Sequence, residues 1–218
     1  EQTVNASGNE LKLVEGGTRE DFVEAITDAD ALIVRSDKVD RALLDQAKNL
    51  KVIVRAGAGY DNIDLEAASD KKICVMNTPG QNSNAVAELV FGMIVMMCRN
   101  QYNGKSGSEL KGKSLGIYAY GQVGRNVARI AKGFDMKIEA LDKFVDDAVM
   151  EADGIKPLHD VKELFSSNDF VSLHIPATAE TKNSIGYDLV MLMPKNGVLV
   201  NTARKEVIAE EGLIRALE

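Results

Sequence analysis

The sequence has only two cysteines among its 218 residues and lacks any long apolar run. Cys74 and Cys98 lie in apolar segments without the CxxC spacing of metal or redox sites. The pattern therefore predicts two buried, reduced thiols and no disulfide. The most apolar stretch, residues 89–98, is too short to span a bilayer. No basic segment followed by an apolar one opens the chain, so we expect no signal peptide and a cytoplasmic protein.

An excess of basic residues is also missing. Lys and Arg number 26 against 33 Asp and Glu, which gives a net charge of −7 and a pI near 5.0. A general nucleic-acid binder would usually be basic, so this class is disfavoured. An anionic small substrate is not excluded, because local potential matters more than net charge. His, Asp and Cys show no metal-ligand spacing, so we predict no metal site.

Short apolar runs alternate with helical patterns throughout the sequence. This alternation predicts an α/β fold built on parallel sheets that are covered by helices. The expected strands are residues 31–35, 52–56, 73–77, 114–118, 137–141, 169–175 and 197–201, and the expected helices are residues 39–49, 63–72, 85–99, 123–133 and 207–218.

A polar, glycine-rich segment, residues 100–113 (NQYNGKSGSELKGK), follows the long apolar helix expected at residues 85–99. Such a composition is typical of a linker. The sequence therefore predicts two α/β domains, residues 1–99 and residues 100–218, divided in this linker or in the helix before it.

The strongest local motif is the turn at residues 119–124 (AYGQVG), which follows an expected strand and opens an expected helix. This is the setting of the dinucleotide-binding fingerprint GxGxxG, with Ala119 in place of the first glycine. A positive φ at Ala119 would carry a small cost. A tight turn with packing glycines is the alternative explanation of the motif alone. The candidate cofactor-binding residues of this turn are Tyr120, Gly121, Gln122, Val123 and Gly124.

An acid at the end of the next expected strand strengthens this interpretation. Asp142 follows Gly121 by about 20 residues, the spacing at which a carboxylate accepts hydrogen bonds from the adenosine ribose. A carboxylate there repels a 2′-phosphate, so we expect NAD rather than NADP. A solvated acid at a strand end is the alternative for Asp142.

Several segments occur in an order that resembles one enzyme family. They are residues 55–64 (RAGAGYDNID), 77–89 (NTPGQNSNAVAEL), 110–125 (LKGKSLGIYAYGQVGR), 171–176 (VSLHIP) and 201–208 (NTARKEVI). Together they resemble the D-2-hydroxyacid dehydrogenases, and most closely the phosphoglycerate-specific members.

The resemblance implies two Rossmann-like, doubly wound parallel-sheet domains. Residues 1–99 would form the substrate domain, without its first strand and its C-terminal return. Residues 100–218 would form the NAD-binding domain, truncated at its C-terminal end. The family's proton donor, a His paired with a Glu, would lie downstream of Arg204 and outside this sequence.

The resemblance also assigns residues to the substrate. Arg204 would be the catalytic arginine, which binds the substrate carboxylate and polarises the reacting carbonyl. Arg35 and Arg55, at strand ends, are candidates for a substrate phosphate, although a simple surface charge explains them about as well. Asn82 would line the cleft. The substrate carboxylate would be bound by the backbone N–H groups of one loop, formed by Ala56, Gly57, Ala58 and Gly59.

Further positions are expected to line the cofactor. His174 lies at a strand end, and we interpret it as part of the cofactor wall rather than as the catalytic histidine; a strand-end histidine with a structural partner is the alternative. His159 is expected at the surface near a helix start. The other candidates from the resemblance are Ile175, Pro176, Thr181, Thr202 and Ala203.

The sequence thus favours an NAD-dependent oxidoreductase acting on a small anionic 2-hydroxy or 2-keto acid. The best substrate pair is 3-phosphoglycerate and 3-phosphohydroxypyruvate, the first step of serine biosynthesis. The alternatives are a glyoxylate or hydroxypyruvate reductase and a non-catalytic NAD-sensing protein on the same fold. The resemblance implies a homodimer or homotetramer, with no nucleic-acid or membrane partner.

Overall fold

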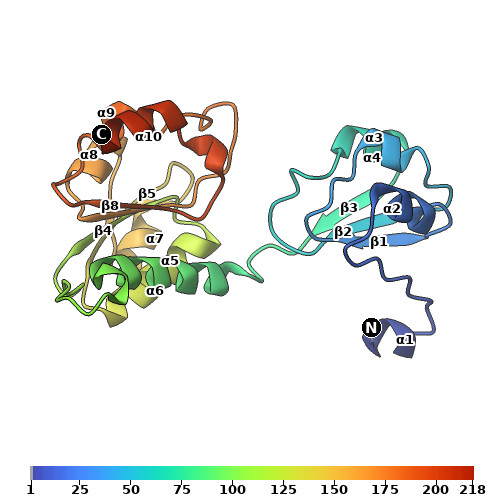
Figure 1. Cartoon of the computed structure of the whole chain (residues 1–218), viewed down its shortest axis with the longest axis horizontal. Helices are drawn as coiled ribbons and strands as arrows, with labels where there is room; N and C mark the ends of the chain where they lie inside the picture. Colours follow the sequence, from blue (N-terminus) through green and yellow to red (C-terminus); the bar gives the residue numbers. More distant parts are fainter. Residues whose placement is uncertain (1) are drawn as a thin grey trace. The chain divides into compact units, whose positions relative to one another are not determined.

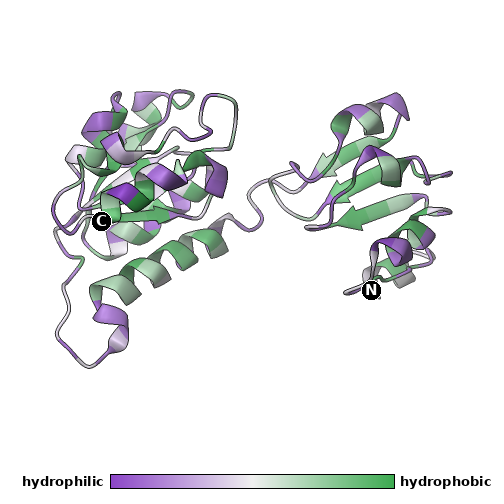
Figure 2. Cartoon of the chain, turned by 45° about the horizontal axis from the view of Figure 1, so that its top comes forward, coloured by the Kyte–Doolittle hydropathy of each residue, from purple (hydrophilic) through white to green (hydrophobic). Residues whose placement is uncertain are grey.

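The computed structural model describes residues 2–218 as two compact units (Figure 1). Unit 1 ends at Asn82, and unit 2 comprises Ser83–Glu218. Each unit has its own parallel sheet, which confirms the predicted α/β fold with two Rossmann-like domains. Most strand residues of both units are hydrophobic, and so is much of the long helix that starts at Ser83 (Figure 2). None of the helices within residues 2–218 has the length and apolar character that a membrane span requires.

Unit 1 is built on a three-stranded sheet in the order β1-β2-β3. Asp40 and Asp64 are the N-cap residues of α3 and α4. Each carboxylate accepts a hydrogen bond from a backbone N–H in the first turn of its helix. The strands are β1 (Ala31–Val34), β2 (Val52–Arg55) and β3 (Cys74–Asn77), and the helices are α1 (Gln2–Ala6), α2 (Arg19–Ile26), α3 (Arg41–Leu44) and α4 (Leu65–Asp70).

The two faces of this sheet differ. Ile53 is fully buried in a core that it shares with apolar residues of α2, α3 and α4. The opposite face carries Ile33 and Met76, which flank Val54 in register and are 66% and 53% exposed. The described residues of unit 1 therefore leave one face of this sheet largely uncovered.

This open face corrects the prediction of two buried thiols. Cys74 lies two residues before Met76 on the same strand, so it points to the same face and is exposed. Cys98 is partly buried. Both cysteines are free, as predicted.

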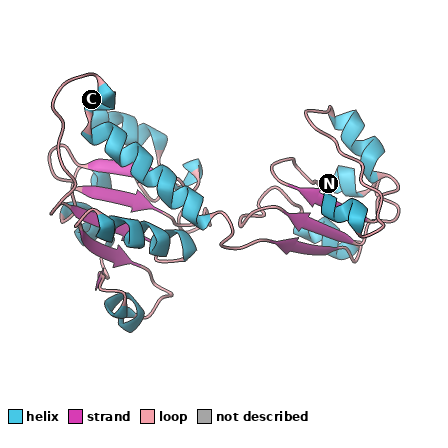
Figure 3. Cartoon of the chain, turned by 90° about the horizontal axis from the view of Figure 1, so that it is seen from below, coloured by secondary structure: helices cyan, strands magenta, loops and turns pink. Residues whose placement is uncertain are grey.

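Unit 2 is built on a five-stranded parallel sheet in the order β6-β5-β4-β7-β8. Helices lie on both faces of this sheet (Figure 3), with α5 and α6 on one face and α8 and α9 on the other. The strands are β4 (Ser114–Tyr118), β5 (Lys137–Leu141), β6 (Lys156–Pro157), β7 (Phe170–Leu173) and β8 (Val198–Asn201). The helices are α5 (Ser83–Cys98), α6 (Gln122–Gly133), α7 (Asp147–Ala152), α8 (Val161–Ser166), α9 (Tyr187–Val190) and α10 (Glu210–Leu217), with 3-10 turns η1 (Asn100–Tyr102) and η2 (Lys205–Val207).

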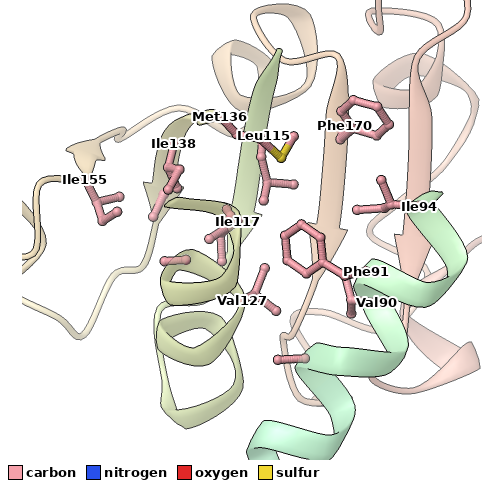
Figure 4. Close-up of a cluster of buried hydrophobic side chains, with 14 of the residues drawn as sticks. Val90, Phe91, Ile94, Leu115, Ile117, Val127, Met136, Ile138, Ile155 and Phe170 are labelled. Atoms are coloured by element: carbon pink, nitrogen blue, oxygen red, sulfur yellow. The ribbon is translucent and has the colours of Figure 1, made fainter. Parts of the chain in front are cut away.

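The boundary between the units corrects the predicted division after residue 99. Helix α5 belongs to unit 2, because Val90, Phe91 and Ile94 are buried in one core with Leu115 of β4 and Val127 of α6 (Figure 4). The polar segment at residues 100–113 is a loop within unit 2 that joins α5 to β4. The composition of that segment indicated a loop correctly but not a domain linker.

Three predicted helices are shorter than expected, and the one expected at residues 63–72 is confined to α4. The helix expected at residues 39–49 is confined to α3, and its last residues form turns in which the Lys48 N–H donates to Thr27 O. The helix expected from residue 207 starts only at Glu210. The cause is a bridge between Ile208 and Ile185, which holds the chain extended before α10.

Candidate functional site

The glycine turn joins β4 to α6 with the geometry that its sequence predicts. Ala119 has φ +80, so the expected conformational cost at this position is present. A Cβ at Gly124 would lie 2.3 Å from Ala119 O, which means that only glycine lets α6 approach the strand so closely. A Cβ at Gly121 would meet no atom within 4 Å. Open space therefore faces the N-terminus of α6, where unpaired N–H groups and partial positive charge favour a pyrophosphate.

Asp142 follows the last residue of β5 and lies beside this turn. Its Oδ2 accepts a hydrogen bond from the Tyr120 N–H at 2.7 Å, and its Oδ1 accepts one from the Phe144 N–H at 2.8 Å. These two bonds fix the carboxylate at the carboxyl end of the sheet. That is where the ribose of a dinucleotide binds in Rossmann-like folds.

The Tyr120 side chain is buried and turned away from the open space of the turn. Its hydroxyl donates to Asp153 Oδ2 at 3.0 Å, and the Arg125 guanidinium lies 5.0 Å from the ring centroid and bonds the same carboxylate. Burial, and then the bond to Asp153, raise the pKa of Tyr120 to about 12. The hydroxyl of this candidate residue is therefore already bonded to Asp153, and its backbone N–H to Asp142.

His174 follows β7 and is neutral at physiological pH. Its Nε2 lies 2.9 Å from Ser172 Oγ, and the backbone N–H of His174 donates to Tyr118 O at 2.9 Å. Burial lowers the pKa of His174 to about 4. At neutral pH the ring is therefore not protonated and has no imidazolium proton to give, which agrees with its exclusion as the catalytic acid. His159 is exposed just before the N-cap of α8, as expected.

The loop after β7 passes close to the turn after β4, since these two strands are neighbours in the sheet. Ile175 is buried and Pro176 is exposed. Thr181 Oγ1 donates to Pro176 O and accepts from the Thr178 N–H, so it closes this loop on itself.

The segment after β8 contains Thr202, Ala203 and Arg204. Its backbone is held by Asn201, whose amide accepts from the Ala203 N–H at 2.9 Å and donates to Arg204 O at 2.9 Å. Asn201 belongs to the segment at residues 201–208, but its sequence pattern indicated no role for this side chain. Thr202 Oγ1 is buried and has no hydrogen-bond partner within residues 2–218. An orphaned hydroxyl in this segment fits the presence of a polar ligand.

The candidate substrate residues of unit 1 form a second group. Gly57 has φ +154, and a Cβ at this residue would lie 1.4 Å from Arg55 Nη1, so the guanidinium lies directly over the loop. Arg55 Nε donates to Arg35 O at 3.0 Å. The N–H groups of Ala58 and Gly59 have no hydrogen-bond acceptor within the described part of the chain.

The same loop is braced from a neighbouring strand. Asn77, the last residue of β3, donates from Nδ2 to Ala58 O at 2.8 Å, and the Thr78 N–H donates to Gly57 O at 3.0 Å. Sequence reasoning assigned no role to Asn77. Arg35 and Asn82 are both exposed.

The structure thus gathers the candidate residues at the carboxyl ends of two sheets. In unit 2 the cofactor candidates follow β4, β5, β7 and β8, which are neighbours in the sheet. In unit 1 the anion-binding candidates follow β1 and β2. Small ligands bind at this end of open α/β sheets. Within residues 2–218, no group of three His, Cys, Asp or Glu side chains could hold a metal ion.

The fold and the turn geometry of unit 2 define a dinucleotide-binding protein of the Rossmann type. Comparison with known proteins narrows this class. The family model described as "D-isomer specific 2-hydroxyacid dehydrogenase, NAD binding domain" matches residues 80–218. The chain therefore belongs to the D-isomer specific 2-hydroxyacid dehydrogenases, and unit 2 is the NAD-binding domain. The resemblance found in the sequence is confirmed.

Individual relatives agree with this assignment. A D-3-phosphoglycerate dehydrogenase of Methanocaldococcus jannaschii is 40% identical over 96% of this chain, which spans 43% of that relative. A hydroxypyruvate reductase of Thermotoga maritima is 36% identical over 89% of this chain, which spans 67% of that relative. The NAD+-bound 3-phosphoglycerate dehydrogenase of Entamoeba histolytica superposes with a TM-score of 0.90 at 46% identity, covering 99% of this chain and 70% of its own.

Proposed function

We propose that the protein interconverts a D-2-hydroxy acid and its 2-keto acid with NAD. Its preferred pair is 3-phosphoglycerate and 3-phosphohydroxypyruvate, so that it serves the first step of serine biosynthesis. The observation that carries this proposal is the Arg55 guanidinium, which lies over Gly57 beside two N–H groups that lack acceptors. Together with Arg35, this arrangement suits a substrate that carries two anionic groups.

Unit 1 is the substrate domain in this proposal. The N–H groups of Ala58 and Gly59 bind the substrate carboxylate, and Arg55 and Arg35 bind its phosphate. Asn77 keeps the loop in shape through its bond to Ala58 O. One face of its sheet, with Ile33, is exposed within the described residues, and the chain spans 43% of the Methanocaldococcus jannaschii relative.

Unit 2 supplies the cofactor-binding residues. Asp142 would accept hydrogen bonds from the ribose, and the Thr202 hydroxyl would hydrogen-bond the bound cofactor. The open space at Gly121 would admit the pyrophosphate. When bound, NAD supplies hydride acceptance and donation. Arg204 polarises the substrate carbonyl. Asn201 fixes the backbone of Arg204 through its hydrogen bond to Arg204 O. The proton donor would be a His paired with a Glu, and His174 is not proposed for this role.

The protein works as a homodimer or homotetramer in this proposal. Exposed apolar side chains on α5, with Leu89 57%, Met96 41% and Met97 49% exposed, give unit 2 a surface suited to association between copies. The pair of free cysteines suits the reducing cytoplasm. The acidic net charge supports a small-molecule substrate rather than a nucleic acid.

Turnover on three substrates tests the proposal. The full-length gene product should reduce 3-phosphohydroxypyruvate with NADH, and with a higher kcat/KM than hydroxypyruvate or glyoxylate. Arg204→Gln should lower kcat by at least about 100-fold, because it removes transition-state charge stabilisation, while leaving NAD binding intact. Preference for glyoxylate would replace the proposal with a reductase of the same family.

Two variants separate the phosphate role from the alternatives. Arg55→Ala and Arg35→Ala should raise KM for the phosphorylated substrate about tenfold and leave hydroxypyruvate reduction little changed. An equal rise in KM for the phosphorylated substrate and for hydroxypyruvate would show that these arginines bind the substrate carboxylate instead. NAD binding without turnover on any 2-keto acid would favour a non-catalytic NAD-sensing protein.

A further inference from the structure

An ion pair crosses the end of the sheet beside the candidate ribose carboxylate. Lys143 follows Asp142 directly after β5, and Glu180 lies in the loop after β7. Strands β5 and β7 flank β4, so the Lys143–Glu180 pair spans the end of the strand that leads into the glycine turn. The two side chains are 60% and 74% exposed, and therefore remain accessible to a ligand and to solvent.

The Lys143 ammonium is held by two groups at once. It hydrogen-bonds the Glu180 carboxylate and lies 5.0 Å from the centroid of the Phe144 ring. The bond to Glu180 raises the pKa of Lys143, and the same bond lowers the pKa of Glu180, so both groups are charged at neutral pH. Burial raises the pKa of Tyr118, and the nearby Lys143 opposes that rise, which places the ammonium close to the last residue of β4.

We propose that Glu180 determines the preference for NAD over NADP by neutralising Lys143, the cation next to Asp142, so that Lys143 is not free to bind a 2′-phosphate. The inference rests on the cofactor roles proposed above. A carboxylate at Asp142 repels a 2′-phosphate, but a free lysine one residue away would offset that repulsion. Glu180 removes this compensation, because its negative charge cancels the positive charge of Lys143.

Binding constants of both cofactors test the role of Glu180. The full-length protein and its Glu180→Gln variant are titrated with NAD+ and with NADP+ by calorimetry at low ionic strength. Glu180→Gln should tighten NADP+ binding by about threefold to fivefold, the upper range of one exposed ion pair, and change NAD+ binding less than about twofold. The gain should shrink at high salt, since exposed charges are screened.

Asp135 provides a matched control. It pairs with Lys111 at 3.6 Å and is 70% exposed, but it precedes β5 and so lies at the opposite end of that strand from Asp142. Asp135→Asn makes the same change in net charge and should alter neither affinity. In the double variant Lys143→Met/Glu180→Gln, the NADP+ gain should disappear, because the proposed phosphate ligand is gone.

The possible failures are distinct. An unchanged NADP+ affinity in a folded Glu180→Gln variant overturns the inference. An equal weakening of both cofactors also overturns it, because the pair would then only tether two loops. If the wild-type protein bound neither cofactor, the cofactor roles proposed for unit 2 would fail and this inference would fall with them.

Discussion

The Tyr120 N–H donates a 2.7 Å hydrogen bond to Asp142 Oδ2, which ties the glycine turn after β4 to the carboxyl end of β5. The second oxygen of the same carboxylate accepts from the Phe144 N–H. Asp142 is therefore held in place before any ligand arrives. A carboxylate that is already oriented loses less conformational entropy on binding a ribose.

Replacing Asp142 should weaken NAD+ binding strongly. Asp142→Ala removes the proposed ribose acceptor and leaves two backbone N–H groups without their acceptor, so the Kd for NAD+ should rise by about tenfold to 100-fold. The affinity for NADP+ should fall less, because the variant also removes the repulsion between the Asp142 carboxylate and the 2′-phosphate. Calorimetric titration measures both constants, and an unchanged NAD+ affinity would remove Asp142 from the cofactor site.

The two glycines of the turn should respond differently to alanine. Gly121→Ala should fold normally, since its Cβ meets no atom within 4 Å, but it should impair NAD+ binding by filling the space proposed for the pyrophosphate. Gly124→Ala should destabilise the protein by about 2 kcal/mol or more, because its Cβ would lie 2.3 Å from Ala119 O. Urea unfolding and NAD+ titration of both variants give the comparison. Equal stabilities would contradict the packing role of Gly124.

Ala119 should be improved by glycine. Its φ of +80 is costly for any residue with a Cβ, so Ala119→Gly should stabilise unit 2 by about 1 kcal/mol. Thermal unfolding in the absence of cofactor measures this. A lower melting temperature for the variant would show that the added chain entropy of glycine outweighs the relief of strain.

The stability of the protein should depend on pH through the buried His174. Burial lowers its folded-state pKa to about 4, below its ordinary value of 6.5, so the unfolded state binds the proton more readily between these two pH values. Stability should therefore fall as the pH drops from about 6.5 to about 4, by up to about 3 kcal/mol from this residue. His174→Gln should lose this part of the pH dependence, as seen by urea unfolding at several pH values. The exposed His159 is the control, and His159→Gln should keep the slope of the wild-type protein.

The sequence predicted the fold well where local pattern and tertiary structure agree. The strands at residues 114–118 and 137–141 were placed correctly to the residue, because their buried positions carry apolar residues, Leu115 and Ile117 in one and Ile138 and Ala140 in the other. The domain boundary predicted from residues 100–113 was wrong. Composition indicates a loop there, but it does not indicate which hydrophobic core the flanking elements join. Only packing shows that Phe91 of α5 belongs to the core of unit 2.

The candidate site was predictable in its motifs but not in its contacts. The turn around Gly121 and the acid at Asp142 follow a known spacing, so their proximity could be inferred. The brace from Asn77 to Ala58 O and the pair of Lys143 with Glu180 join segments far apart in the sequence. No local pattern indicates such pairs. The exposure of Cys74 was missed for the same reason, since it depends on which face of β3 the helices cover.

The separate cores of the two units have a consequence for heat denaturation. Within residues 2–218, Ile53 belongs to a cluster confined to unit 1, whereas Leu115 and Leu164 belong to clusters confined to unit 2. All residues proposed to bind the cofactor lie in unit 2, so NAD+ should stabilise that unit by mass action. A calorimetric scan of the chain would then show a heat-absorption peak of unit 2 that moves upward with NAD+ concentration.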